Sequence, residues 1–341
     1  MGKWMKNVYR VIGLSIILPL LIITIIAFGF EEYLEKIEFA VVAEWFRTIK
    51  NILPDAWEAG LSNYKCLLSL LSVVAVALYL LCWFNKPMIV VVKHVSFSPE
   101  LAELNHNLRK DFYVRECPLD LSKEMKNQNI SKALDLQDSE IEKIKRKAQK
   151  RQLGYYGIAH TPFVFRAGFF VGDQKKIHLF HRIRDNESDF CEWEKNALGR
   201  WNSSLCNSEE QNRNCKSNEL FVAIGTSFVI KDTEIASIAG ANKHILILRT
   251  RDIGFDVIGS YEQAEAIRKN ILDTIRDLEK KYDIKKLHLM IASSVAFTFF
   301  LGTAFSAQHD PSIVVYHYEN GKYVWGIDMS KKGDAAIVRN N

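Results

Sequence analysis

The sequence predicts an α/β protein of two tandem units, each with a mainly parallel sheet, preceded by a two-helix transmembrane hairpin. Strand-like runs alternate with helical segments twice along the chain, which is typical of parallel-sheet α/β folds. Two stretches near the start carry no charge: residues 11–30 and residues 66–84. A bilayer core about 30 Å thick needs roughly 20 apolar residues in a helix, so both stretches are long enough to span it.

Charges beside these stretches predict the orientation of the hairpin. The connecting segment, residues 31–65, holds seven acidic and four basic residues. Basic residues flank the hairpin on its other side: Lys3, Lys6, Arg10, Lys86 and Lys93. The positive-inside rule therefore places both chain ends in the cytoplasm and the connector outside it. The alternatives are two buried helices of a soluble protein and, for residues 1–30, a cleaved signal peptide, although no A-x-A site follows.

Composition also predicts the organisation of the chain. The hairpin occupies residues 1–86, with spans at about 11–30 and 66–84. It is followed by a first α/β unit over 87–200, a polar linker over 201–218, a second α/β unit over 219–330 and a tail over 331–341. Charges balance up to Phe84, so the net charge of +5 lies in the remainder. This mild surplus permits an anionic ligand but does not indicate binding of a long nucleic acid.

In the first unit, β-branched and apolar runs predict buried strands, and spacings of three and four residues predict helices. The expected strands are 88–92, 153–159 and 176–181, and the expected helical segments are 99–152 and 163–171. Residues 185–218 are rich in Asn, Ser and charge, which predicts a loop or linker with room for one short helix.

The second unit repeats this series. Strands are expected at 220–224, 287–292 and 312–317, with a helix at 295–305. A further helix begins at Ser260, which forms a predicted capping box with Gln263. Its predicted buried face consists of Ala264, Ile267, Ile271, Ile275 and Leu278.

Short segments of the two units match in order, which predicts an internal duplication. Residues 92–97 match 223–228 at an offset of 131, with His94 aligned to Gly225. The strand–turn–helix segments ending at Gly168 and Gly302 match at an offset of 134, and residues 176–181 match 312–317 at 136. Small loop insertions explain this drift. The alternative is a chance similarity of two generic α/β halves.

Candidate ligand-binding residues follow from the duplicated fold, because ligands of open parallel sheets bind beyond the carboxyl ends of the strands. Helix N-termini at such turns favour phosphate. The turns of the first unit contribute His94, Ser96, His160, Thr161 and Pro162, and those of the second contribute Gly225, Thr226, Ser227, Ser293 and Ser294. The alternative is that Thr161, Ser293 and Ser294 only cap their helices.

Two further candidates follow the last strand of each unit. Arg182 is suited to pairing with a phosphate, and Tyr318 is suited to stacking on a base. Ordinary strand-end surface is the alternative for both.

The familiar catalytic signatures are absent from the sequence: there is no P-loop, no G-x-G-x-x-G after a strand, no G-x-S-x-G and no H-E-x-x-H. We therefore expect a binding module with no catalytic residue, no metal and no cofactor. Cys191, Cys206 and Cys215 lack a C-x2-C pair, so free thiols are expected and a zinc site is the alternative.

The repeated residues resemble the SAVED domain, a fusion of two CARF-like, Rossmann-type units found in bacterial CBASS anti-phage effectors. The resemblance lies in residues 155–162 with Gly168, residues 287–294 with Gly302, and residues 311–316 followed by 323–325. It covers roughly residues 88–330. Residues 186–218, a long polar stretch between the units, leave the geometry between them open.

The resemblance implies a cytosolic domain that binds a cyclic di- or trinucleotide made by a partner nucleotidyltransferase and then assembles into a homo-oligomer. Because the hairpin stands where many relatives carry a toxic enzyme, the chain resembles the transmembrane subclass. Its implied output is disruption of the lipid of the bacterial inner membrane, leading to abortive infection. The alternatives are a membrane-anchored enzyme acting on a nucleotide, with His160 and Ser294 as its best candidates, and a passive two-span receptor or scaffold.

Overall fold

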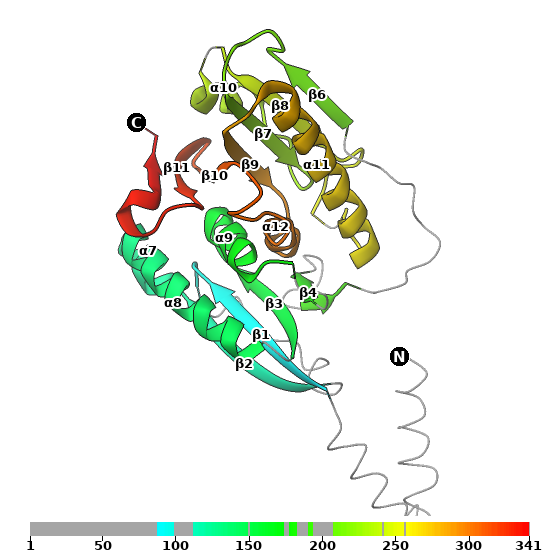
Figure 1. The fold of residues 1–341 in the computed structure, drawn as a ribbon. Helices are drawn as coiled ribbons and strands as arrows, with labels where there is room; N and C mark the ends of the chain where they lie inside the picture. Colours follow the sequence, from blue (N-terminus) through cyan, green and yellow to red (C-terminus); the bar gives the residue numbers. More distant parts are fainter. Residues whose placement is uncertain are drawn as a thin grey trace, which may run out of the picture. The chain divides into compact units, whose positions relative to one another are not determined.

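Two β-sheets with helices packed between them organise the part of the chain described in the computed structural model (Figure 1). The described residues are 87–98, 112–148, 151–173, 177–182, 190–193, 207–240, 242–255 and 257–340. All of them belong to one compact unit, Pro87–Asn341. No helix within these ranges is long and apolar enough to cross a membrane. The predicted spans at 11–30 and 66–84 lie outside the described residues.

The first sheet has the order β2-β1-β3-β4-β5. Its first four strands are parallel, and β5 runs antiparallel to β4. The strands are β1 (Met88–Val95), β2 (Tyr113–Asp120), β3 (Gln152–Ile158), β4 (Ile177–Arg182) and β5 (Phe190–Glu192). The helices of this half are α7 (Ser122–Lys126), α8 (Ile130–Ala148) and α9 (Thr161–Val171).

The second sheet has the order β12-β11-β10-β9-β7-β8-β6, with β10, β9, β7 and β8 parallel. Its strands are β6 (Asn207–Gln211), β7 (Glu219–Gly225), β8 (His244–Arg249), β9 (Lys286–Ala292), β10 (Ser312–Glu319), β11 (Lys322–Asp328) and β12 (Ile337–Arg339). The helices of this half are α10 (Asp232–Ala239), α11 (Tyr261–Tyr282), α12 (Val295–Gly302) and the 3-10 helix η3 (Gly333–Ala336). The predicted α/β fold is confirmed.

Strand order reveals the duplication directly, because β2-β1-β3-β4-β5 corresponds to β8-β7-β9-β10-β11. In the same way α8 corresponds to α11, and α9 to α12. The register corrects the predicted alignment by one residue. Val95 pairs with Ile158 on β3, and Gly225 pairs with Ala292 on β9, so Gly225 is the equivalent of Val95 and not of His94.

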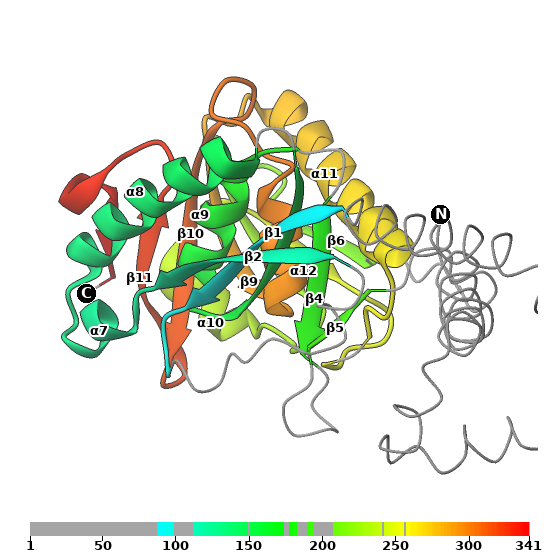
Figure 2. The same ribbon diagram turned by 90° about the horizontal axis from the view of Figure 1, so that it is seen from below.

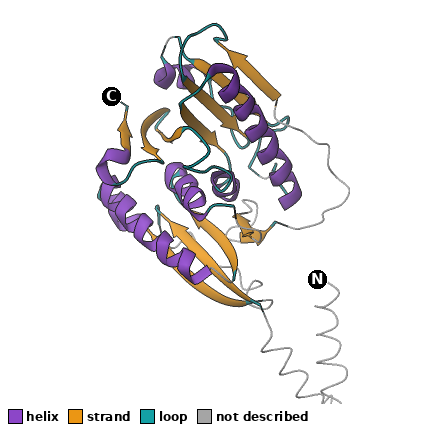
Figure 3. Ribbon diagram, in the orientation of Figure 1, coloured by secondary structure: helices purple, strands orange, loops and turns teal. Residues whose placement is uncertain are grey.

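The two equivalent helices α9 and α12 pack side by side in the centre, between the sheets (Figures 1 and 3). Viewed from below, the strands of the first sheet lie in front of them (Figure 2). A Cβ added to Gly168 would lie 2.1 Å from the carbonyl oxygen of Phe299, and one added to Gly302 would lie 2.3 Å from that of Phe165. These reciprocal contacts show that the backbones touch, which only glycine permits at both positions.

One apolar core fills the space around these helices and includes residues of both halves. Fully buried rings on α9 and α12, such as Phe163, Phe165, Phe297 and Phe299, form its centre. The predicted face of α11 is also confirmed, since Ala264, Ile267, Ile271, Ile275 and Leu278 are buried. The halves are therefore joined by core packing and not only by the chain.

Three predicted segments need correction. Strand β2 lies within residues 99–152, which were expected to be helical; only Cys117 and Leu119 alternate inward on this edge strand. Strand β6 lies within the predicted linker 201–218 and pairs with β8, although its residues are polar and largely exposed. The predicted tail 331–341 contains η3 and β12, which extends the second sheet. Polar or very short edge elements lack the apolar pattern on which the predictions depended.

The start of α11 is confirmed at Ser260, but the capping box differs from the one predicted. The side chain of Ser260 makes no capping hydrogen bond, and Gln263 Oε1 accepts from the backbone N–H of Gly259 at 2.8 Å. Gln263 thus satisfies a donor one residue before the expected one.

Candidate ligand-binding site

The turns after β1 and β3 are tied together by Ser96. The backbone N–H of Ser96 donates to the carbonyl of Ile158 at 3.1 Å, so the chain leaving β1 stays beside β3. The backbone N–H of His160 donates to Ser96 Oγ at 2.8 Å, and a second hydrogen bond joins Ser96 Oγ to His160 Nδ1 at 2.5 Å. His160 is the N-cap residue of α9, with Pro162 in the first turn of that helix. Ser96 therefore fixes both the cap residue and its ring.

The second half repeats this arrangement with hydroxyl groups in place of the histidine. The backbone N–H groups of Thr226 and Ser227 both donate to the carbonyl of Ala292 at 3.0 Å. Thr226 Oγ1 and Ser293 Oγ share a hydrogen bond of 2.7 Å. Ser294 caps α12 by accepting from the backbone N–H of Phe297 at 3.3 Å. Thr226 is thus the equivalent of Ser96, and Ser294 is the equivalent of His160.

Helix α9 begins beside strands of the other half. The ring of His160 lies 4.7 Å from that of His317, at the end of β10, and 6.2 Å from that of Trp325 on β11. The His317 and Trp325 rings are 4.9 Å apart. His160 also stacks on Phe97, with ring centroids 4.0 Å apart. We call Phe97, His160, His317 and Trp325 the ring cluster.

The two predicted strand-end residues are not brought into this cluster. Side chains alternate between the faces of a strand. His317 shares the inner face of β10 with Ile313 and Val315, so Tyr318 lies on the opposite face, where its hydroxyl donates to Glu234 Oε1 on α10 at 2.6 Å. By the same alternation Arg182 lies on the outer face of β4, the face of Phe180.

Most of the other candidates do lie at these turns, but His94 lies beneath them. Its side chain is fully buried, and its Nδ1 shares a hydrogen bond of 2.9 Å with the Tyr155 hydroxyl. Sequence reasoning selected Tyr318 in place of its neighbour His317, and it did not select Trp325. The two-residue alternation of side chains along β10 is the sequence signal that would have favoured His317 over Tyr318. Trp325 lies on β11, the hairpin partner of β10, and only the fold brings it close to His160.

The imidazole rings of the site are neutral at physiological pH. Burial, and secondarily the neighbouring His317, lower the pKa of His160 to about 3. Burial lowers the pKa of His317 to about 4. Burial, with His160 as a second cause, lowers the pKa of His94 to about 3. A neutral ring offers a flat face for stacking and one nitrogen that accepts a hydrogen bond.

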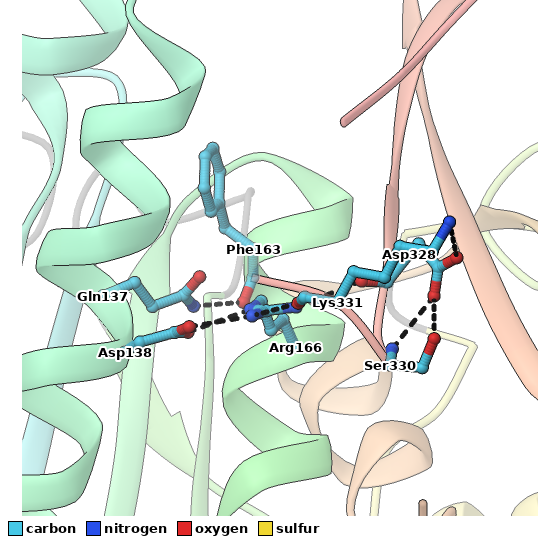
Figure 4. Close-up of polar contacts among 7 residues, drawn as sticks. All are labelled: Gln137, Asp138, Phe163, Arg166, Asp328, Ser330 and Lys331. Atoms are coloured by element: carbon cyan, nitrogen blue, oxygen red, sulfur yellow. Dashed lines mark hydrogen bonds and ion pairs between the residues drawn. The ribbon is translucent and has the colours of Figure 1, made fainter. Parts of the chain in front are cut away.

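Arg166 anchors α9 to neighbouring parts of the fold (Figure 4). Its side chain is fully buried and pairs with both carboxylate oxygens of Asp138 on α8, at 2.9 and 2.8 Å. It also donates to the backbone carbonyls of Asp328 at 3.3 Å and Lys331 at 3.0 Å, which belong to the second half. Nearby, Gln137 Nε2 donates to the carbonyl of Phe163 at 2.6 Å. These contacts hold α9 against helix α8 and against the C-terminal segment together.

Within the described ranges, no group of three or more His, Cys, Asp or Glu side chains is placed so that it could hold a metal ion. Neither Cys191 nor Cys215 forms a disulfide bond. Cys206, the third member of the alternative zinc site, lies outside the described residues.

A model of the SAVED family, described as "SMODS-associated and fused to various effectors sensor domain", matches residues 136–329. This segment is more than half of the 341 residues. The chain belongs to the SAVED family. The matched residues include α9, α12 and three of the four members of the ring cluster; Phe97 lies outside the match.

Two solved receptor structures share the fold of this chain. The Acinetobacter baumannii Cap4 SAVED/CARF-domain containing receptor with the cyclic trinucleotide 2′3′3′-cAAA matches with a TM-score of 0.52 and 14% identity, covering 80% of this chain and 60% of that one. The same receptor with 3′3′3′-cAAA matches with a TM-score of 0.51 and 14% identity, covering 77% and 59%. This SAVED protein thus spans about three-fifths of the length of these receptors. No curated protein matches the chain.

Proposed function

We propose that this SAVED protein is a sensor that binds a cyclic di- or trinucleotide made by a partner nucleotidyltransferase. The observation that carries the proposal is the ring cluster at the N-terminus of α9, to which both halves of the duplicated fold contribute. Aromatic faces stack on bases, and free N–H groups at a helix start attract phosphate. The A. baumannii receptors with the same fold have structures with cyclic trinucleotides.

The proposed ligand contacts both halves. Ser96, His160, Thr161 and Pro162 form the turn of the first half, and Thr226, Ser227, Ser293 and Ser294 form that of the second. A ring of phosphates suits two related helix starts, because each offers backbone donors and the positive end of a helix dipole. Arg182 and Tyr318 are left out of the proposed contacts, since both lie on outer sheet faces.

The proposed output is disruption of the bacterial inner membrane. Support comes from the sequence, in which the uncharged stretches 11–30 and 66–84 are long enough to span a bilayer and are flanked by basic residues. In this proposal both termini are cytoplasmic, the ligand drives assembly into a homo-oligomer, and clustered hairpins breach the lipid. Growth arrest of the infected cell, as in abortive infection, is the expected consequence.

We also propose that the chain leaves its ligand intact. An efficient general base has a pKa near the working pH. The pKa of His160, lowered by burial to about 3, makes its ring a weak base, and its partner Ser96 is only 2% exposed. The Ser96–His160 pair therefore supports a structural role for the hydroxyl more than a nucleophilic one. Recovery of a cleaved ligand after long incubation with the protein would contradict this part of the proposal.

The binding step is tested by titrating the full-length chain in detergent micelles with cyclic di- and trinucleotides while its size is followed by light scattering. We expect saturable binding and an increase in mass on ligand addition. Absence of binding across the panel would overturn the proposal.

The output is tested by expressing the chain in cells that lack every other component and supplying an activating ligand. Loss of membrane potential is expected for the natural chain. The variant Leu21→Arg introduces a charge into the first apolar stretch, so it should bind ligand normally but leave the membrane intact. Intact membranes with the natural chain would favour a passive receptor that signals to another protein.

A further inference from the structure

Phe97 presents an aromatic ring to solvent immediately after β1. The side chain is 48% exposed, although one face of its ring stacks on His160 at 4.0 Å with an interplanar angle of 22°. A single exposed phenylalanine is ordinary on a protein surface. Phe97 differs because it belongs to a cluster of rings: it stacks on His160, and His160 meets His317 edge-on and Trp325 at a tilt, with Trp325 only 8% exposed. The outer ring is thus exposed while the rings behind it are held by the core.

The equivalent turn of the second half lacks such a stack. The strand register places Ser227 in the position of Phe97 and Ser294 in that of His160. The exposed phenylalanine of that turn, Phe228, is 54% exposed and meets Phe255 edge-on, with ring centroids 4.8 Å apart at 86°. The two equivalent turns are therefore chemically unequal, with the Phe97 and His160 rings at the turn of the first half and hydroxyl groups at the turn of the second.

We propose that the outer face of Phe97 stacks on one nucleobase of the ligand, while the hydroxyl-lined turn of the second half contacts its sugar–phosphate ring. This inference rests on the proposed function and deepens it by assigning a base-binding subsite to the turn of the first half, where Phe97 lies. Stacking gains from contact area, so a purine fits this subsite better than a pyrimidine. The bases of the ligand are then not equivalent, and a cyclic ligand binds in one orientation, with a purine on Phe97.

The test compares two exposed phenylalanines that follow equivalent strands. The full-length chain and its variants are titrated with 3′3′3′-cAAA, with the corresponding cyclic tri-uridylate, and with cyclic dinucleotides of adenine and guanine. Phe97→Leu removes the aromatic face and keeps an apolar side chain, whereas Phe97→Trp enlarges the face. Phe228→Leu is the matched control. Unchanged thermal unfolding of each variant shows that the fold is retained, as expected for side chains about half exposed.

Phe97→Leu is expected to weaken binding of a purine ligand by about tenfold, and Phe97→Trp to restore or strengthen it. Phe228→Leu should leave the affinity unchanged, and the loss in Phe97→Leu should be smaller for the pyrimidine ring. Equal affinities of Phe97→Leu and the natural chain would overturn this inference while leaving the proposed function in place. Failure of the natural chain to bind any of the probes would overturn the proposed function and this inference with it.

Discussion

The close contact between α9 and α12 predicts how a glycine substitution changes the stability of the protein. The predicted change is opposite in sign to the one expected from helix propensity alone. Replacing Gly302 by alanine in a helix would ordinarily stabilise the protein by about 1 kcal/mol, because glycine is the poorer helix former. Here the new Cβ would lie 2.3 Å from the carbonyl oxygen of Phe165 and 3.2 Å from the backbone nitrogen of Phe169. We therefore expect Gly302→Ala to destabilise.

The size of the destabilisation follows from how far the distance between the new Cβ and the Phe165 carbonyl oxygen falls below an ordinary contact. Carbon and carbonyl oxygen normally approach to about 3.3–3.6 Å, so the helices would have to separate by roughly 1 Å. Both obstructing atoms belong to backbone, which cannot rotate away. Overpacking of this kind costs about 3 kcal/mol at the upper end of its usual range. After the propensity gain, the net loss of unfolding free energy is about 2 kcal/mol, which lowers the Tm by roughly 4–8 °C for a domain of this size.

The assay is thermal unfolding of the full-length chain, followed by circular dichroism in detergent. Gly259→Ala is the matched control, because a Cβ at that position meets nothing within 4 Å. It should shift the free energy of unfolding by no more than about 0.5 kcal/mol. A Tm for Gly302→Ala equal to or above that of the natural chain would refute the close contact between α9 and α12.

Three further predictions follow from the same region. Arg166→Met leaves Asp138 and two backbone carbonyls without their partner and should lower the free energy of unfolding by about 3 kcal/mol in urea titrations. Adding Asp138→Leu should recover part of the loss. No recovery would show that the unpaired carboxylate charge of Asp138 is not the cause. Burial lowers the pKa of His94 to about 3, against about 6.5 in the unfolded chain, so the neutral ring's contribution to the free energy of unfolding is complete above pH 6.5 and is lost as the pH falls toward 3. At pH 5 this loss is about 2 kcal/mol. A urea midpoint that stays constant from pH 7 to pH 5 would argue against a neutral buried ring. Ser294→Asp places a negative charge at the start of α12 and should abolish ligand binding without unfolding the protein, whereas Ser294→Thr should retain ligand binding. Equal ligand affinity of the two variants would show that the start of α12 is not part of the site.

Local sequence patterns predict some parts of this fold and not others. The buried strands β7 and β9 and the helix α11 were predicted because continuous apolar runs and a 3.6-residue period survive in isolation. Strands β2 and β6 were missed because edge strands bury few side chains and carry no such run. Their place in a sheet depends on backbone pairing with a neighbour, which no local pattern encodes.

The site divides in the same way. Ser96 and His160 were predicted because they follow strands directly, and this position is a local property. His317 and Trp325 reach them from the other half, so only the packing of the two halves brings the four rings together. Arg182 and Tyr318 were chosen for their chemistry, and the alternation of the strands turns them to the outer faces.

The central claim is that one cyclic nucleotide is held jointly by both halves of the duplicated fold. Isothermal titration calorimetry of the full-length chain with the best-binding cyclic trinucleotide tests it most directly, with Ser96→Ala and Thr226→Val as variants of the two equivalent turns. We predict one ligand per chain and a weaker affinity in each variant, since each removes a hydroxyl that ties one turn together. Two ligands per chain, a response to only one of the two variants, or no heat of binding would contradict it.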